Sequence, residues 1–146
     1  MMFSRAEKTP LVKEQLYSLL AAAEDETLAR RALELALTTE PPATIRLDMI
    51  SDIAGLHPDL AFDFAIAHFD KVNGLLDSFA RSSFVPYLGR SSTDPAMVDK
   101  INKFAIAHIA PDSRRMADSS AATVADRVRV RRERIPAIDA WIAANR

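Results

Sequence analysis

The chain has 146 residues, the usual length of one domain, and 49% of them are hydrophobic, which is enough to build a core. The 19 basic and 20 acidic residues give a formal net charge of -1, so no long-range field attracts nucleic acid or an anionic membrane. The absence of cysteine excludes disulfides, cysteine metal sites and thiol catalysis. No apolar run approaches the ~20 residues that span a bilayer.

A first helix is predicted to begin at Thr9-Pro10, where a capping residue precedes a proline in the first helical position. Apolar residues then recur at helical spacing: Val12, Leu16, Leu19 and Ala23. We expect residues 1–8 to form a flexible N-terminal segment and residues 9–146 to form a single helical-repeat domain.

A second helix is predicted to be capped by Asp25 and to end at Glu40-Pro41-Pro42. Its inward face is expected to hold Leu28, Ala32 and Leu35. A third helix fits residues 43–56, and its inward residues are expected to be Leu47, Ile50 and Ile53.

The corner His57-Pro58-Asp59 predicts the start of a fourth helix, which carries Leu60, Phe64 and Ala67 and runs to about Arg81. Gly74 is a possible break in it. A short helix over residues 84–88 is expected to stop at Gly89. The next helix is expected to start at Thr93-Asp94-Pro95 and to align Met97, Ile101, Phe104 and His108.

The last helix is predicted from about Ser119, and Pro136 is expected to kink or split it. An apolar stripe runs along it and includes Val124, Val128, Ile135, Ile138 and Ile142. Trp141 beside this stripe is expected to be a packing anchor. Because no segment alternates with the period of two that marks a strand, the fold class is predicted to be all-α.

Three helix–corner–helix units can be overlaid on one another: residues 17–37, 48–69 and 84–109. Their first inward residues are expected to be Leu28, Leu60 and Met97, which stand 32 and 37 positions apart. This period is typical of paired-helix solenoids of the HEAT or armadillo kind, in which stacking of the units makes the core. The sequence therefore predicts an α-α superhelix.

The string FAIAH occurs twice, at residues 64–68 and 104–108, and each copy supplies a histidine. Two interpretations are open: a repeated structural unit, or halves of a metal site. The first is favoured, because neither His68 nor His108 has a histidine or carboxylate three or four residues away on the same face. We expect no catalytic residue and no metal ligand in this chain.

Arginines dominate residues 127–134, with Glu133 opposing them, for a local charge of about +4. Nucleic-acid binding is disfavoured, because aromatic residues for base stacking are missing and the valines indicate a buried helix. Arg131 interrupts the apolar stripe, and either a buried ion pair or a place on the concave surface of the solenoid would explain it.

Several strings in this chain resemble the C-terminal helical domain of zinc-dependent aminopeptidases of the alanyl and puromycin-sensitive type. The family's A-x-R-A-L-x-L-x-L helix is matched by Ala29, Arg31, Ala32, Leu33, Leu35 and Leu37. The M/V-I-x-x-I/V-A-G helix is matched by Met49, Ile50, Ile53, Ala54 and Gly55. The H-x-A-P-x-x-x-R turn is matched by His108, Ala110, Pro111 and Arg115. Residues 127–142 match the closing helix pair, so the resemblance extends from about Thr9 onward.

The resemblance implies a fragment of a larger peptidase, in which this domain encloses the substrate chamber and the catalytic domain holds the zinc. The H-E-x-x-H and G-x-M-E-N strings of that catalytic domain do not occur here. Many members carry an arginine where this chain has Ser83, so a contact with the peptide carboxylate does not carry over. Arg81 and Arg90 are the proposed substitutes, and together with Arg131 they are the candidate residues that line the chamber.

The partners implied are the catalytic domain of the same polypeptide and the peptides it cleaves, with neither nucleic acid nor a membrane segment. The parent's compartment stays open between cytoplasm and periplasm, with or without membrane association. The alternative hypothesis is a freestanding HEAT-like module that binds another protein on its concave face.

Overall fold

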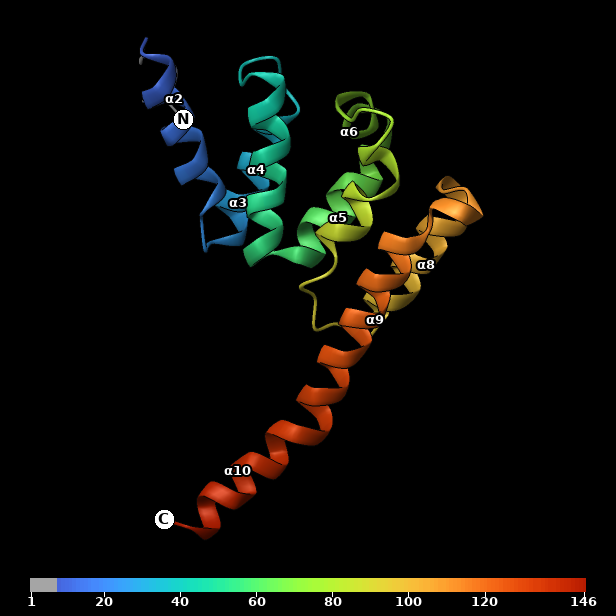
Figure 1. The fold of residues 1–146 in the computed structure, drawn as a ribbon. Helices are drawn as coiled ribbons and strands as arrows, with labels where there is room; N and C mark the ends of the chain where they lie inside the picture. Colours follow the sequence, from blue (N-terminus) through green and yellow to red (C-terminus); the bar gives the residue numbers. More distant parts are fainter. Residues whose placement is uncertain (1–7) are drawn as a thin grey trace.

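The computed structural model describes residues 8–146, and this part of the chain folds into helices joined by short corners, without any strand (Figure 1). The all-α prediction is therefore confirmed. The expected N-terminal segment lies outside the described residues, apart from Lys8. From Lys8 onward, the helices are too short or too polar for any of them to cross a membrane.

The first three helices begin and end within a few residues of the predicted positions, and the fourth begins where predicted. They are α2 (Pro10–Ala21), α3 (Glu26–Ala36), α4 (Ala43–Leu56) and α5 (Pro58–Ala67). Prolines open α2 and α5, where the missing N–H costs nothing because the first turn has no partner for it. The Asp25 carboxylate caps α3 by accepting a 3.0 Å hydrogen bond from the Leu28 N–H.

The fourth helix is shorter than predicted, because it ends at Ala67 and does not continue to Arg81. The chain leaves the helical path at His68 (φ -118, ψ 35) and then forms a separate helix, α6 (Phe69–Leu75), which contains Gly74. Gly74 therefore lies within a helix and does not interrupt one. A short 3₁₀ turn, η1 (Ala80–Ser82), follows it, and α7 (Phe84–Leu88) ends at Gly89 as expected.

The second half of the chain contains two helices that pack against each other, and the second of them continues into a long helical segment at the end of the chain. α8 (Ala96–His108) leads through the 3₁₀ turn η2 (Pro111–Ser113) into α9 (Arg115–Arg129), which begins earlier than the predicted Ser119. A π turn, η3 (Val130–Arg134), then connects α9 to α10 (Ile135–Ala144). The predicted interruption near Pro136 thus takes the form of a π turn just before the proline.

The helices pack in a series along the body. α2 and α3 both contact α4, α4 contacts α5, α5 contacts α7, and α9 packs against α7 and α8. Aromatic side chains connect α5 and α6 with α8: Phe104 lies 6.5 Å from Phe62 and 5.7 Å from Phe69 between ring centroids, both edge to face. Such pairs add to the hydrophobic energy of burying the rings.

The predicted inward faces are correct for some helices and wrong for others. Ile50, Ile53, Met97 and Ile101 are buried as expected. Leu28, in contrast, is 51% exposed, because α3 turns Ala29, Ala32, Leu33, Leu35 and Ala36 inward. On α2 the buried residues are Tyr17 and Ala21, and not the predicted stripe.

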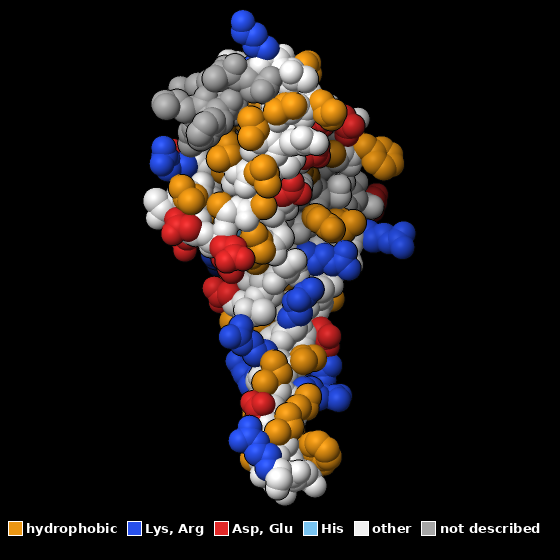
Figure 2. All heavy atoms as spheres, turned by 90° about the vertical axis from the view of Figure 1, so that its left-hand side faces the viewer, with side chains coloured by type: hydrophobic (Ala, Val, Ile, Leu, Met, Phe, Trp, Pro, Cys, Tyr) orange, Lys and Arg blue, Asp and Glu red, His pale blue; other side chains and the backbone are white. Residues whose placement is uncertain are grey.

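The outer face of α2 is apolar, and no other part of residues 8–146 covers it. Leu11 and Leu19 are 64% and 70% exposed, and Val12 is also exposed. Figure 2 shows hydrophobic side chains gathered on the part of the body that α2 forms. Burial of such side chains would be favourable by roughly 25 cal/mol for each Å² removed from water, so this face is suited to a contact.

The end of the chain projects from the body as a helical arm, which we define as residues 130–144 (Figure 1). Every residue of the arm is exposed. Trp141 is 66% exposed and Ile138 is 56% exposed, so the predicted packing anchor and the apolar stripe around it are not part of the core. The prediction that the valines place residues 127–134 in a buried helix is also wrong, since only Val128 packs against the core, and only partly.

Asp52 on α4 provides a pH-dependent prediction. Partial desolvation of the carboxyl, together with the negative charge of Asp48, raises the pKa of Asp52 above its ordinary value of 3.8. A carboxyl whose pKa is higher in the folded state destabilises the fold while it is ionised, and this penalty disappears as the pH falls below 3.8. We expect Asp52→Asn to raise the free energy of unfolding at pH 7 and to lose this advantage in acid. Urea denaturation at both pH values measures it, and a variant that is less stable at pH 7 would contradict the expectation.

Candidate functional site

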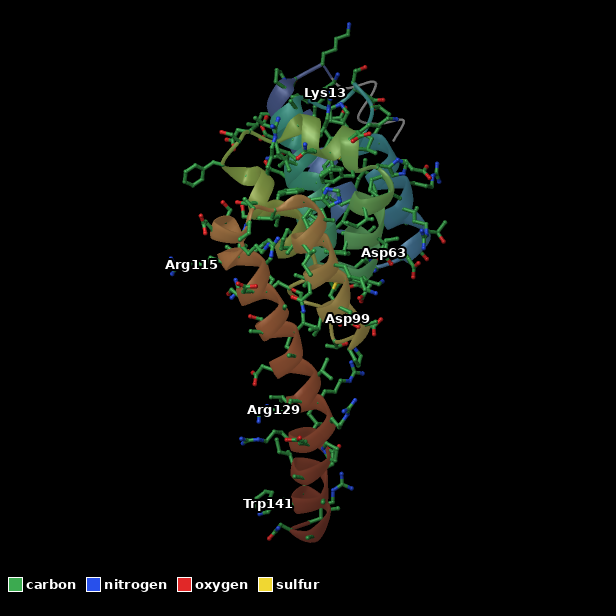
Figure 3. All side chains as sticks on the ribbon, turned by 90° about the vertical axis from the view of Figure 1, so that its right-hand side faces the viewer. Lys13, Asp63, Asp99, Arg115, Arg129 and Trp141 are labelled. Carbon is green, nitrogen blue, oxygen red and sulfur yellow. The ribbon has the colours of Figure 1, made fainter. Side chains whose placement is uncertain are left out.

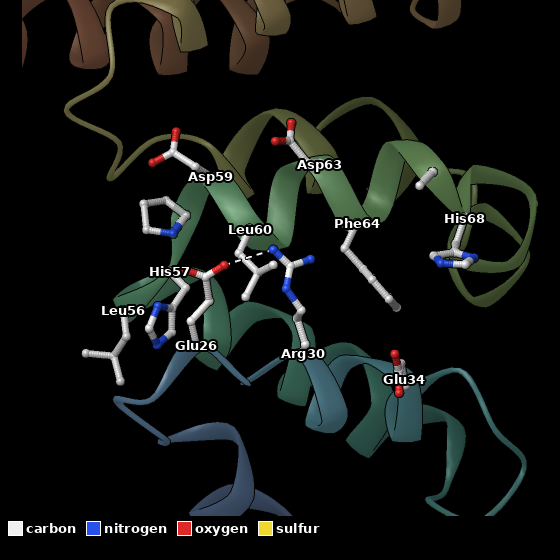
Figure 4. A pocket seen from close by; sticks show the side chains of 12 residues that line it. Glu26, Arg30, Glu34, Leu56, His57, Asp59, Leu60, Asp63, Phe64 and His68 are labelled. Carbon is white, nitrogen blue, oxygen red and sulfur yellow. Dashed lines mark hydrogen bonds and ion pairs between the residues drawn. The ribbon is translucent and has the colours of Figure 1, made fainter. Parts of the chain in front are cut away.

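An open groove of about 670 Å³ lies between α3 and α5 (Figure 4). Leu60 and Phe64 point from α5 toward α3 and form its apolar floor, and Leu56 and Pro58 extend this floor toward one end. Leu60 and Phe64 are spaced four apart on α5, so they share one face of the helix. The groove has the apolar floor and polar rim that are typical of binding sites.

The wall formed by α3 is charged. Glu26, Arg30 and Glu34 stand four residues apart and so lie on one side of this helix. The Arg30 guanidinium donates to the Glu26 carboxylate at 2.8 Å, and both side chains are largely exposed. An exposed pair of this kind contributes little to stability, at most about 1 kcal/mol, so both groups are free to exchange partners with a ligand.

The carboxylates of α5 are held on the other side of that helix. Asp59 accepts a hydrogen bond from the Ser92 hydroxyl at 2.7 Å, and Asp63 accepts from the Lys100 ammonium at 2.9 Å. The hydrogen bond to Asp63 raises the pKa of Lys100 above its ordinary value. Both interactions tie α5 to the region around α8, which fixes the position of the helix that carries the groove floor.

The two histidines of the groove lie at its opposite ends (Figure 4). His57 Nε2 lies 2.9 Å from the Ala23 carbonyl oxygen, and His68 stacks on the Phe64 ring with 4.5 Å between centroids. In the second FAIAH copy, His108 stacks on Phe104 at 4.9 Å. His68 and His108 therefore each pack on the phenylalanine four residues before them, which is the geometry of a repeated structural unit.

A zinc site in a protein requires at least three protein ligands. Residues 8–146 bring no three histidine, aspartate or glutamate side chains together in a way that could hold a metal ion.

The three candidate arginines lie on separate elements, and none of them lines the groove. Arg81 is exposed on η1, and Arg90 lies half-buried beyond α7, with its guanidinium 5.9 Å from the centre of the Tyr87 ring. Arg131 is exposed on the π turn and donates to the Thr93 hydroxyl at 2.9 Å. The three side chains thus lie on different elements and have different contacts.

Sequence reasoning did not identify the groove, because it assigned Leu60 and Phe64 to the core and did not single out Glu26, Arg30 or Glu34. Two sequence features point to the groove. One is the row of charged residues four apart on α3, and the other is the apolar stripe on α5. Which helices are neighbours is a tertiary property, so these features could be interpreted only with the structure at hand.

Comparisons with models of protein families, with curated proteins and with solved structures find no match for this chain. The groove can bind a segment that offers apolar side chains to Leu60 and Phe64 and hydrogen-bonding groups to Glu26, Arg30 and Glu34.

Proposed function

We propose that this chain is the C-terminal helical domain of a zinc aminopeptidase, a protein that removes residues from the N-termini of peptides. In this proposal the domain is not catalytic by itself. It encloses the substrate chamber of a catalytic domain that belongs to the same polypeptide and holds the zinc. The positions of the matched residues in the fold support this proposal.

The observation that carries the proposal is that the matched apolar residues within α3 and α4, two successive helices, are buried. In α3, Ala29, Ala32, Leu33 and Leu35 are all buried. In α4, Met49, Ile50, Ile53 and Ala54 are all buried. The His108 to Arg115 match covers the end of α8, the η2 turn and the first residue of α9. A shared pattern of core residues and turns supports a shared fold.

The proposed arrangement is an α-α superhelix of the HEAT or armadillo kind. Its support is the order of packing, in which α2–α3, α4–α5 and α7–α8 form successive helix–corner–helix units and neighbours along the chain are neighbours in space. Stacking of this kind gives one side a concave surface. The groove between α3 and α5 is where that surface would meet a peptide segment.

The docking face for the catalytic domain is proposed to be the outer side of α2. Its exposed leucines, Leu11 and Leu19, form a shallow apolar hollow together with Glu14, Gln15 and Ser18. A freestanding solenoid needs a polar outer face on its terminal units, because nothing else covers them. The apolar outer face of α2 therefore favours a domain covered by another domain over the alternative of a freestanding binding module.

The purified chain provides the test. We expect it to contain no stoichiometric zinc by elemental analysis and to release no product from aminoacyl-p-nitroanilide substrates. Cleavage by the pure chain that a chelator abolishes and added zinc restores would overturn the proposal, because the activity would then reside in these residues.

A further inference from the structure

The arm carries a row of exposed apolar side chains that nothing in the described part of the chain covers. They are Val130, Ile135, Ile138, Trp141 and Ile142. Figure 2 shows hydrophobic side chains along the projecting helix with basic ones beside them, and Figure 3 shows Trp141 far from the body. An apolar stripe of this size on a helix without tertiary contacts is typical of a binding surface.

The π turn places Val130 in line with the rest of this row. The Ile135 N–H donates to the Val130 carbonyl, five residues earlier, so these two residues lie one turn apart on the same side. Ile138 and Ile142 follow at spacings of three and four. An apolar row with alternating spacings of three and four is the pattern with which two helices pair side by side in a coiled coil.

We propose that two copies of this chain associate through their arms, which pair antiparallel with the apolar row of one against that of the other. This inference is independent of the proposed peptidase function, since it rests only on the arm. A second copy covers the row, because the charges of one arm are complementary to those of a second arm that runs in the opposite direction.

The charges along the arm are distributed unevenly. Its base, where α9 meets the π turn, carries five arginines and two acids: Arg127, Arg129, Arg131, Arg132, Arg134, Asp126 and Glu133. The only charged residue of α10 is Asp139. Parallel pairing would set one arginine-rich base against the other, which costs free energy, whereas antiparallel pairing brings Asp139, the single charge of α10, to the arginine-rich base of the second copy.

The antiparallel register follows from the apolar row. When the two arms cross between Pro136 and Ala137, Ile135 packs on Ile138 of the second copy and Val130 packs on Ile142 of the second copy. The same register brings Arg134 beside Trp141 of the second copy, where a guanidinium can lie over the indole ring. Asp139 then lies among the arginines of the second copy's base.

The shape of the molecule is compatible with this arrangement. The arm leads away from the body along most of its length (Figure 1). Reversal of one arm places the two bodies at opposite ends of the paired helices, so they do not collide. Parallel pairing would bring the bodies side by side, where they compete for the same space.

Analytical ultracentrifugation of the full chain over a wide range of concentration tests the association. We expect a mass that rises to twice the 16.1 kDa of one chain. Ile138→Asp, which places a charge in the middle of the row, should return the mass to that of one chain. Ile106→Asp is the matched control, since Ile106 is 70% exposed on α8, outside the arm, and the variant should associate like the wild type.

The chain's lack of cysteine allows the orientation to be tested by crosslinking. The double variant Val130→Cys/Ile142→Cys should form a covalent dimer under mild oxidation, whereas neither single variant should do so. Wild type that remains a single chain at every concentration would overturn the proposal, as would Ile138→Asp that still associates. Efficient crosslinking of Ile142→Cys alone would overturn the antiparallel register. None of these outcomes bears on zinc or peptidase activity, so the two proposals fail separately.

Discussion

Replacement of Phe62 by alanine is expected to lower the free energy of unfolding by about 3–5 kcal/mol. Phe62 is 1% exposed, and its ring contacts that of Phe104 edge to face. Removal of the ring eliminates its transfer energy and leaves a cavity where α5 meets α8. Since whole domains are stable by only about 5–15 kcal/mol, this single change would remove a large part of the stability.

Urea denaturation followed by far-UV circular dichroism measures this loss. Ile66→Ala is the matched control, because Ile66 lies on the same helix but is 41% exposed, and its replacement should cost less than about 1 kcal/mol. Equal losses for the two variants would contradict the packing described here, since only Phe62 is placed in the core.

Gly89→Ala and Gly74→Ala are expected to change stability in opposite directions. A Cβ at Gly89 would lie 2.6 Å from Met97 Sδ and 3.2 Å from a ring carbon of Phe62, so Gly89→Ala should cost about 1–3 kcal/mol through overpacking. A Cβ at Gly74 meets no atom within 4 Å, and Gly74 lies in α6. Gly74→Ala should therefore stabilise by about 0.5–1 kcal/mol through the better helix propensity of alanine.

A second substitution tests whether Met97 is the reason that Gly89→Ala costs stability. In a Met97→Ala background, the sulfur that crowds the new Cβ is absent, so Gly89→Ala should cost measurably less than it does in the wild type. Thermal or urea denaturation of the four chains of this cycle gives the coupling energy. A cost at Gly89 that does not depend on Met97 would show that close approach of these side chains is not the reason for the glycine.

The helices that could be predicted from the sequence are those with strong local signals. Helix α4 has its predicted bounds because prolines precede it and the His57-Pro58 corner follows it. The cap at Asp25 and the stop at Gly89 are likewise set by short-range geometry. Capping and turn residues act within a few positions of the chain, so their effects can be inferred without knowledge of tertiary contacts.

The errors concern which apolar face meets which neighbour. Leu28 is exposed, and Ile138 and Trp141 lie on the arm, although each belongs to an apolar row with helical spacing. Leu60 and Phe64 pack against the core as expected but are only partly buried, so they also line a groove. Periodicity identifies a face that favours contact, but it does not identify the contact. Similarly, the break at His68 was assigned to Gly74, because the backbone turn at a histidine has no distinctive sequence signal.

The measurement that most directly tests the central claim is the size of the native polypeptide that contains this sequence. An antibody raised against the chain would detect it in cells that express it, and mass spectrometry of the captured polypeptide would identify its peptides. The account predicts a polypeptide several times larger than 16.1 kDa that contains an H-E-x-x-H peptide. A polypeptide of 16.1 kDa would contradict it and would favour an independent helical module that binds another protein.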